Sequence, residues 1–266
     1  MSEAGWLWIA LLGACAGSLM NMVVWRLPRK VLQLEAADYG LWLPRSHCPR
    51  CRSTIAWYDN LPLLSWLRLR GRCRHCAQPI PLRYPLTETA CVLLSLLLTL
   101  LLPPDGLLIA ALLLAWFLLA LALIDRDHQL LPDALTLPLL WLGLACQIGG
   151  WLPQLTLEQS VCGAMAGYLS LWLLASGYRL LRGKEALGMG DAKLLAALGA
   201  WLGWQPLPQL LLLASASGIV WLVASRGLRG RSLAAPFPFG PCLAAAGGLL
   251  FLVENSAMLA GLLCLS

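Results

Sequence analysis

Charged residues are scarce in this chain of 266 residues. Asp, Glu, Lys and Arg make up 12 % of it, whereas hydrophobic residues make up 59 % and the mean hydropathy is +0.73. A soluble globular domain carries about 25 % charged residues. The composition therefore excludes an ordinary soluble protein and predicts an all-α polytopic membrane protein.

Basic residues are also missing ahead of the first apolar run. Glu3 precedes this run, whereas Arg26 and Arg29 follow it. A secretory signal peptide has the opposite order of charge and apolar segment. We therefore expect an uncleaved first helix, although Leu12–Cys15 resembles a lipoprotein cleavage box.

Long apolar segments predict about eight transmembrane helices. The clearest is Leu107–Ile124, which contains no charged residue and is long enough to cross a hydrocarbon core of about 30 Å. The other candidate spans are roughly residues 5–25, 86–102, 134–150, 159–178, 187–205, 207–225 and 237–254. The spans 187–205 and 207–225 are joined by a very short linker and are the pair most easily counted as one helix.

The basic residues fall in alternate loops. Eight helices with the N-terminus outside the cytoplasm give the cytoplasmic side the segments 26–85, 125–133, 179–190 and 226–236. All 19 Lys and Arg residues lie in these segments or at Lys193. The opposite side holds only acidic residues, at Glu3, Asp105, Glu158 and Glu254. This is the charge asymmetry of the positive-inside rule. The net charge of +6 is thus a topology signal and indicates no nucleic-acid partner.

Two C-x-x-C pairs lie in the cytoplasmic loop of residues 26–85. The pairs are Cys48 with Cys51 and Cys73 with Cys76, and 21 residues separate them. This spacing is typical of a tetrahedral four-cysteine zinc site, which leaves no open position and is therefore structural. Two disulfides are the alternative, and a reducing cytosol disfavours them. His47 and His75 flank the pairs as substitute ligands, but we interpret both as surface residues.

Two acidic positions are expected at the same membrane face. Asp191 opens the helix at 187–205, and a cluster of three aspartates follows the helix at 107–124. The three are Asp125, Asp127 and Asp133. Carboxylates at a membrane face are functional candidates because their placement there is costly, and two facing carboxylates hold one proton between them. Such a pair can activate water for attack on a peptide carbonyl.

Other interpretations of these aspartates remain open. Asp191 follows Gly188 and Gly190 and is also a candidate helix N-cap. A transporter that uses the two carboxylates as a proton or ion site is a second hypothesis, and an assembly scaffold with a zinc-binding loop is a third. Lys193 is not expected to pair with Asp191, since helix residues two apart point to different sides.

Five blocks of the sequence resemble the bacterial prepilin peptidases, a family of G-x-G-D membrane aspartyl proteases. The blocks are GMGDAK (Gly188–Lys193), GSLMNMVVWRLP (Gly17–Pro28), the cysteine loop through PLRYPLTE, ALIDRDHQLLPDALTLPLL (Ala122–Leu140) and PFPFGPCLAAAG (Pro236–Gly247). They run in order through nearly the whole chain.

The resemblance implies a function and a set of site residues. It implies cleavage of the basic leader of type IV prepilins or type II secretion pseudopilins at the cytoplasmic face of the bacterial inner membrane. It also implies N-methylation of the new N-terminus with S-adenosylmethionine. The family's catalytic aspartates match Asp125 and Asp191, and its cysteines match the four named above. Some family members lack those cysteines, so zinc need not be essential for the chemistry.

No methyltransferase fingerprint is present, because no glycine-rich nucleotide loop follows a predicted strand. We therefore assign no residues to S-adenosylmethionine. Glu88, near the cytoplasmic end of the second span, is a further candidate for attracting a basic leader. The expected organisation is a first transmembrane helix (1–25), a cytoplasmic zinc-binding loop domain (26–85) and a seven-helix membrane catalytic domain (86–266). Expected partners are prepilin or pseudopilin precursors and the lipid bilayer, and a second copy of the chain is a further candidate.

Overall fold

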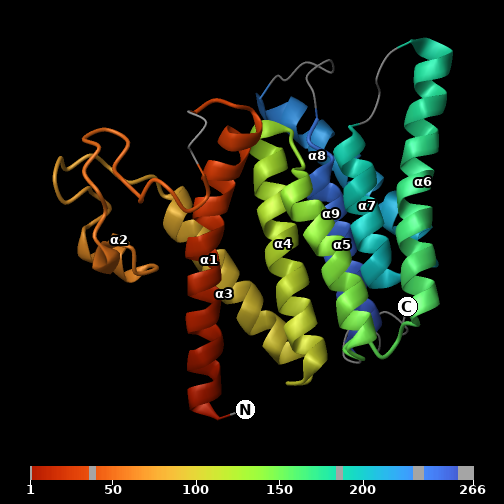
Figure 1. Ribbon diagram of the computed structural model, residues 1–266, viewed down its shortest axis with the longest axis horizontal. Coiled ribbons are helices and arrows are strands. Elements are labelled where there is room, and N and C mark those ends of the chain that lie inside the picture. Colours follow the sequence, from red (N-terminus) through yellow and green to blue (C-terminus); the bar gives the residue numbers. More distant parts are fainter. Residues whose placement is uncertain (1, 36–39, 184–187, 230–236, 257–266) are drawn as a thin grey trace. The chain divides into compact units, whose positions relative to one another are not determined.

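The computed structural model describes residues 2–35, 40–183, 188–229 and 237–256 (Figure 1). Over these ranges all regular structure is helical, and β-structure is limited to two isolated bridges. The chain divides into two compact units, Met1–Leu100 (unit 1) and Leu101–Ser266 (unit 2). The predicted all-α class is therefore confirmed, whereas the predicted domain limits at residues 25 and 85 stay predictions.

Unit 1 contains two long helices and the cysteine loop between them. Its elements are α1 (Glu3–Val31), the 3₁₀ helix η1 (Trp57–Asp59), α2 (Leu64–Arg68) and α3 (Arg83–Leu101). Two glycines four residues apart bring α1 against α3. A Cβ on Gly13 would lie 2.9 Å from Val92 Cα, and one on Gly17 would lie 2.6 Å from Glu88 Cα. This small-residue spacing lets apolar helices approach closely within a membrane.

Unit 2 is a bundle of six helices joined mostly by short connections. The helices are α4 (Gly106–His128), α5 (Asp133–Ile148), α6 (Leu157–Arg182), α7 (Met189–Leu202), α8 (Leu207–Arg229) and α9 (Gly240–Asn255). Because only four residues separate α4 from α5, the start of α5 lies beside the end of α4. The hydrogen bond from Lys193 to Asp133 brings the start of α7 to the same end. The hydrogen bond from Gly240 to Asp125 brings the start of α9 to the same end.

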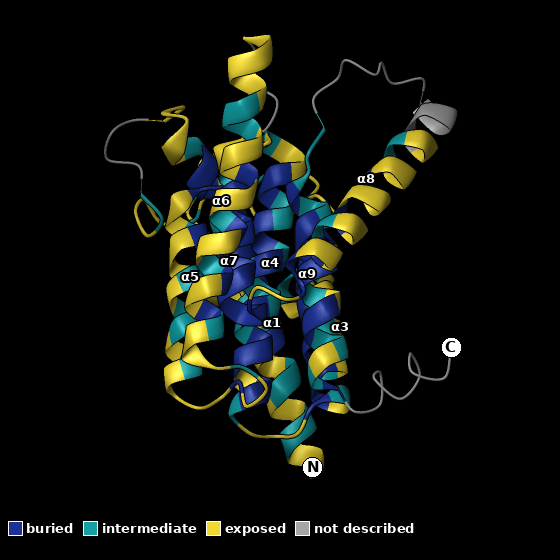
Figure 2. Cartoon of the chain, turned by 90° about the vertical axis from the view of Figure 1, so that its right-hand side faces the viewer, coloured by how far each residue is buried: buried dark blue, intermediate teal, exposed yellow. Residues whose placement is uncertain are grey.

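Helix α7 lies in the interior of unit 2. Every residue from Leu194 to Leu202 is buried, and α7 packs against α5, α6 and α9. Figure 2 shows α7 and α9 mostly buried, whereas α6 and α8 are largely exposed. The backbones of α6 and α7 touch at one glycine pair. A Cβ on Gly163 would lie 2.2 Å from the Gly199 carbonyl oxygen, and the reverse distance is 2.1 Å.

Each of the eight predicted spans forms a helix of its own. Helices α7 and α8 are separate, because Gly203 adopts a φ of +80° directly after α7. Leu187, the first residue of one predicted span, lies outside the described residues. The helices long and apolar enough to cross a membrane number five among the described residues: α1, α3, α4, α6 and the Leu207–Ala224 part of α8.

The remaining three helices are short. Helices α5 and α9 have 16 residues each and α7 has 14. A helix of 14 residues is about 21 Å long, less than the hydrocarbon thickness of about 30 Å. The polytopic all-α fold is thus confirmed, but the count of eight membrane spans is not.

The glycine contact between α6 and α7 predicts a position-specific effect on stability. Gly163→Ala should lower the free energy of unfolding by about 1–3 kcal/mol, because its methyl group would overlap the α7 backbone. Gly177→Ala is the matched control on the same helix, since a Cβ there meets no atom within 4 Å. That control should be neutral or slightly stabilising. Unfolding of the purified proteins in detergent measures both effects, and equal stabilities would contradict the packing described.

Candidate functional site

Asp125 lies in the last turn of α4 and is only 5 % exposed. Its Oδ2 accepts a hydrogen bond of 2.8 Å from the backbone N–H of Gly240, the first residue of α9. A Cβ on Gly240 would lie 2.8 Å from that oxygen. Only a glycine therefore lets the backbone approach the carboxylate this closely.

Asp191 lies in the first turn of α7 and is partly buried. Its carboxylate is close enough to that of Asp125 for the two charges to interact. The helix N-cap is Gly188, three residues earlier, and no side chain caps this end. The interpretation of Asp191 as an N-cap is therefore wrong.

One leucine packs against both glycines that adjoin the aspartates. A Cβ on Gly190 would lie 2.8 Å from Leu131 Cβ, and a Cβ on Gly240 would lie 3.1 Å from Leu131 Cδ2. Gly190 immediately precedes Asp191, whereas the Gly240 N–H donates a hydrogen bond to Asp125. Leu131 thus contacts the backbone beside both aspartates. A side chain at either glycine would push Leu131 out of this position.

The other two candidate aspartates have cationic partners. Asp127 forms an ion pair of 3.1 Å with Arg126, and Asp133 accepts hydrogen bonds of 2.6 and 2.7 Å from Nζ of Lys193. Lys193 is therefore engaged with Asp133, in agreement with the expectation that it would not pair with Asp191. These surroundings distinguish Asp125 from its two neighbours, which the sequence pattern alone does not.

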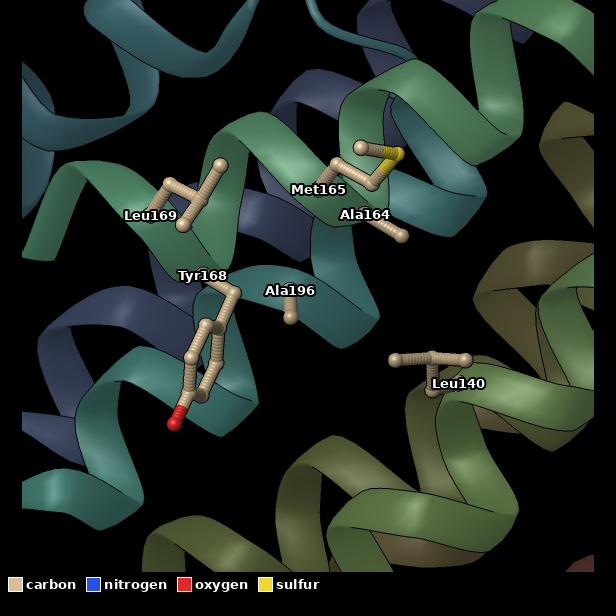
Figure 3. A pocket seen from close by; sticks show the side chains of 6 residues that line it. All are labelled: Leu140, Ala164, Met165, Tyr168, Leu169 and Ala196. Carbon is tan, nitrogen blue, oxygen red and sulfur yellow. The ribbon is translucent and has the colours of Figure 1, made fainter. Parts of the chain in front are cut away.

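An apolar pocket of about 360 Å³ lies between α5, α6 and α7 (Figure 3). Its lining residues are Leu140, Ala164, Met165, Tyr168, Leu169 and Ala196. In Figure 3 the phenol oxygen of Tyr168 points away from Ala196 and Leu140. The lining contains no carboxylate, so this pocket has no group able to perform the hydrolysis discussed for the aspartates.

The four loop cysteines converge in unit 1. The Sγ atoms of Cys48, Cys51, Cys73 and Cys76 all lie within 4.8 Å of one another, and none is in a disulfide. Sγ of Cys48 and Sγ of Cys76 are 3.8 Å apart. Thiolates in a tetrahedral zinc site with Zn–S bonds of about 2.3 Å are separated by about 3.8 Å. The donor set thus fits a tetrahedral metal ion.

The two cysteine pairs are built by the same turn. The amide of Arg52 donates to the carbonyl of Cys48 at 2.9 Å, and the amide of Ala77 donates to that of Cys73 at 3.0 Å. Arg52 and Ala77 both adopt positive φ angles, of 56° and 54°. The repeated geometry turns both sulfur atoms of each pair toward the same point.

Polar groups next to the cysteine cluster form an ion pair and hydrogen bonds that stabilise the loop and the thiolate form of Cys51. Arg74 forms an ion pair with Asp59 of η1 and holds the pKa of that carboxyl below its ordinary value. Hydrogen bonds from Ser53 lower the pKa of the Cys51 thiol to about 6, which favours the thiolate that binds metals. Among the described groups, the cluster includes no histidine, and His47 instead contacts the carbonyl of Arg45 at 3.1 Å.

Glu88 is placed by contacts within unit 1. Its side chain is buried, at 9 % exposure, and its Oε2 accepts a hydrogen bond of 2.8 Å from the Leu63 amide. Leu63 has a φ of 59° and immediately precedes α2. These contacts indicate that Glu88 fixes the cysteine loop to α3, and its suggested attraction for a basic leader stays a hypothesis.

Two residues of the candidate site carry no individual signal in the sequence. Gly240 lies within the block PFPFGPCLAAAG, but its hydrogen bond spans 115 positions to Asp125. Leu131 is one leucine among many. A glycine near the start of the predicted span 237–254 was the available clue for Gly240, whereas nothing in the pattern distinguishes Leu131.

Comparisons with known proteins agree with this geometry. The family model "Bacterial Peptidase A24 N-terminal domain" matches residues 11–102, and "Type IV leader peptidase family" matches residues 112–223. No solved structure matches the chain.

Similar proteins from several bacteria carry the name "Prepilin leader peptidase/N-methyltransferase". The protein from Pectobacterium carotovorum subsp. carotovorum is 49 % identical over 260 residues, covering 93 % of this chain and 92 % of its own length. The Aeromonas salmonicida (strain A449) protein is 47 % identical, with coverage of 94 % and 92 %. The Klebsiella pneumoniae protein is 54 % identical over 205 residues, with coverage of 77 % and 88 %. The chain therefore belongs to the type IV leader peptidase family.

Proposed function

We propose that this chain is a membrane aspartyl endopeptidase that removes the leader of type IV prepilins or type II secretion pseudopilins and then N-methylates the new N-terminus. The observation that supports the proposal is that Gly190, the residue before Asp191, and Gly240, which donates to Asp125, both pack against Leu131 at one end of unit 2. The names of the relatives describe both activities. They give no support to the transporter alternative.

The two carboxyl groups have complementary roles in the proposed cleavage. One is ionised and takes a proton from a water molecule, whose oxygen then attacks the scissile carbonyl carbon. The other holds the shared proton and donates it to the leaving amide nitrogen as the carbon–nitrogen bond breaks. A scaffold protein would need neither carboxylate, so this chemistry also accounts for the cost of placing them beside apolar helices.

The backbone around Asp125 orients one of these groups. The Gly240 N–H donates to Oδ2 of Asp125 and fixes the rotation of the carboxyl. Leu131 packs against the same glycine. The Gly240 amide is therefore proposed to position Asp125, and not to react itself.

The location of charge supports an orientation in the inner membrane. In unit 2, Arg126 and Lys193 lie in the last turn of α4 and the second turn of α7, at the end that holds Asp125 and Asp191. The positive-inside rule assigns such an end to the cytoplasm. A substrate with a basic leader in the cytoplasm and an apolar helix in the bilayer would present its scissile bond there. The cysteine loop is proposed to be cytoplasmic by the same rule, with the N-terminus periplasmic.

Zinc is the metal proposed for the four cysteines. Four thiolates at mutual distances below 4.8 Å suit Zn²⁺ and leave no open position, so the ion would hold the loop together and take no part in the reaction. The methyl donor implied by the relatives' names is S-adenosylmethionine. No residues are assigned to it.

Substitution of either proposed catalytic aspartate should abolish cleavage. Asp125→Asn and Asp191→Asn should each reduce leader removal from a pseudopilin precursor at least about 100-fold, because general acid–base catalysis contributes that much or more. The measurement is intact-mass analysis of precursor incubated with purified protein, with and without S-adenosylmethionine. Asp127→Asn and Asp133→Asn are the matched controls and should retain cleavage. Wild-type rates in either Asp125→Asn or Asp191→Asn would remove that residue from the mechanism.

Filling the space beside Asp125 should impair cleavage without removing any functional group. In Gly240→Ala the new methyl group must displace the carboxyl, and a misplacement of about 1 Å costs about 100-fold in rate. Gly248→Ala on the same helix is the control, because a Cβ there meets its nearest neighbour at an ordinary 3.7 Å. Cleavage assays of the two variants at matched expression separate the effects. Full activity of Gly240→Ala would show that the Asp125 position is not critical.

The purified protein should contain about one zinc ion per chain, because four thiolates complete one tetrahedral shell. Elemental analysis should show loss of the metal in Cys48→Ser and retention in Cys15→Ser, since Cys15 lies outside the cluster. Metal-free protein with two disulfides in the loop would contradict the zinc proposal and the cytoplasmic position of the loop.

A further inference from the structure

A short helix in the cysteine loop turns an apolar face away from the loop's own core. In α2, Leu64 is 65 % exposed and Leu67 is 64 % exposed. Trp66 instead packs within the loop, where a Cβ on Gly71 would lie 2.8 Å from its ring. Leu64, Leu67 and Arg68 share one side of the helix, because residues three and four apart are neighbours there. These three residues are called the α2 face.

The segment that leads into α2 is also apolar and exposed. Trp57 of η1 is 74 % exposed, and Leu61 is exposed as well. The two elements are neighbours, because η1 packs against α2. Exposed apolar side chains that gather in one segment indicate contact with another surface, and tryptophan is typical of the level of the lipid headgroups. The segment thus has the composition of an interfacial anchor.

A hydrogen bond fixes the depth at which α2 begins. Leu63 immediately precedes α2, and its amide donates to Oε2 of Glu88 at 2.8 Å. Glu88 lies in the second turn of α3, a helix of 19 residues that is apolar enough to cross a membrane. A helix of this length measures about 28 Å, so all of it is needed to cross a hydrocarbon core of about 30 Å. Arg83, the first residue of α3, must then lie at the membrane boundary, and α2 begins close to that level.

The beginning of the loop is held to α1 in a similar way. Arg26 lies near the end of α1, and its Nη1 donates to the carbonyls of Gly40 and Leu41 at 3.2 Å each. The next two residues, Trp42 and Leu43, are also exposed. The loop is therefore attached to both helices of unit 1 at points beside its exposed apolar side chains. These attachments keep those side chains close to the helix ends.

The charge of the loop selects the kind of surface that it fits. Residues 40–82 contain seven arginines and a single acidic residue, Asp59, and Asp59 is paired with Arg74. Clustered arginines beside apolar side chains are attracted to anionic lipid headgroups. A basic leader peptide would be repelled by the same arginines. The surface therefore fits an anionic membrane and does not fit the leader of the proposed substrate.

We propose that the α2 face docks the cysteine loop onto anionic lipids at the membrane boundary. Leu64 and Leu67 enter the layer between the headgroups and the acyl chains, and the guanidinium of Arg68 contacts lipid phosphates. Lipid is the nearest anionic surface at the depth that the bond between Leu63 and Glu88 gives to α2. The loop thus lies on the membrane and does not extend into the surrounding solution.

Labelling of an introduced cysteine tests the location of the α2 face. Full-length Leu64→Cys protein in nanodiscs that contain phosphatidylglycerol is treated with a water-soluble maleimide, and the tryptic peptide of residues 53–68, which has no native cysteine, is analysed by mass spectrometry. Thr54→Cys is the matched control, because Thr54 is exposed and lies in the same peptide. We expect Leu64→Cys to react at least about tenfold more slowly, since an apolar environment disfavours the reactive thiolate.

Lipid preference tests the role of charge. Phosphatidylglycerol and phosphatidylcholine are added at equal concentration to the full-length protein in detergent, and retained lipid is counted by native mass spectrometry. The wild type should prefer phosphatidylglycerol, and Arg68→Gln should lower that preference about fivefold, the effect of one basic residue at an anionic surface. Arg50→Gln is the matched control, because it removes one charge from the same loop at a guanidinium already engaged with Gln78. That control should keep the preference.

The outcomes separate lipid from other partners. A face that binds a soluble acidic protein would leave Leu64→Cys as reactive as Thr54→Cys in nanodiscs, and that result would overturn the proposal. An unchanged lipid preference in Arg68→Gln, or an equal loss in Arg50→Gln, would also overturn it. Neither measurement depends on leader cleavage, so both tests are independent of the proposed peptidase activity.

Discussion

The burial of α7 is the constraint on which the proposed active site depends. A helix of 14 residues that carries Asp191 in its first turn is too short to cross a bilayer alone, so its neighbours must surround it. The backbone contact between Gly163 and Gly199 holds α6 close against α7. Contacts at Gly190 and Gly240 then position Leu131 between the first turns of α7 and α9. The site thus depends on several close approaches that only glycine allows.

Much of the fold and part of the site could be predicted from the sequence. The apolar segments located α1 and the seven helices α3 to α9, and the C-x-x-C spacing predicted the cysteine cluster, because both signals are local. The number of membrane spans was less certain, since composition does not separate a spanning helix from one buried in protein. Helix α7 is the example: it is as apolar as a span, but its neighbours bury it.

The surroundings of the aspartates could not be predicted, because they depend on contacts distant in sequence. The pattern left Asp125, Asp127 and Asp133 equivalent, and only resemblance to a family favoured the first. In the structure, Lys193 engages Asp133 and the Gly240 amide engages Asp125. The N-cap interpretation of Asp191 failed for a local reason, because the helix begins two residues before it, at Met189, with Gly188 as its N-cap.

Helix direction gives acidic residues different electrostatic surroundings at the two ends of unit 2. Asp191 at the start of α7 lies where a helix favours negative charge. Glu254 at the end of α9 lies where a helix disfavours it. The first is explained by the paired carboxylate chemistry proposed here, whereas the second is an exposed residue that water can solvate.

Cross-linking of cysteines introduced at the two proposed catalytic positions tests the central claim most directly. A protein with Asp125→Cys and Asp191→Cys is treated with a short thiol-specific cross-linker, and the linked peptides are identified by mass spectrometry. Asp127→Cys with Asp191→Cys is the matched comparison, since its first position differs by only two residues. The account predicts that the 125–191 pair is linked faster and more completely. Preferential linking of the 127–191 pair, or no linking of 125 to 191, would contradict it.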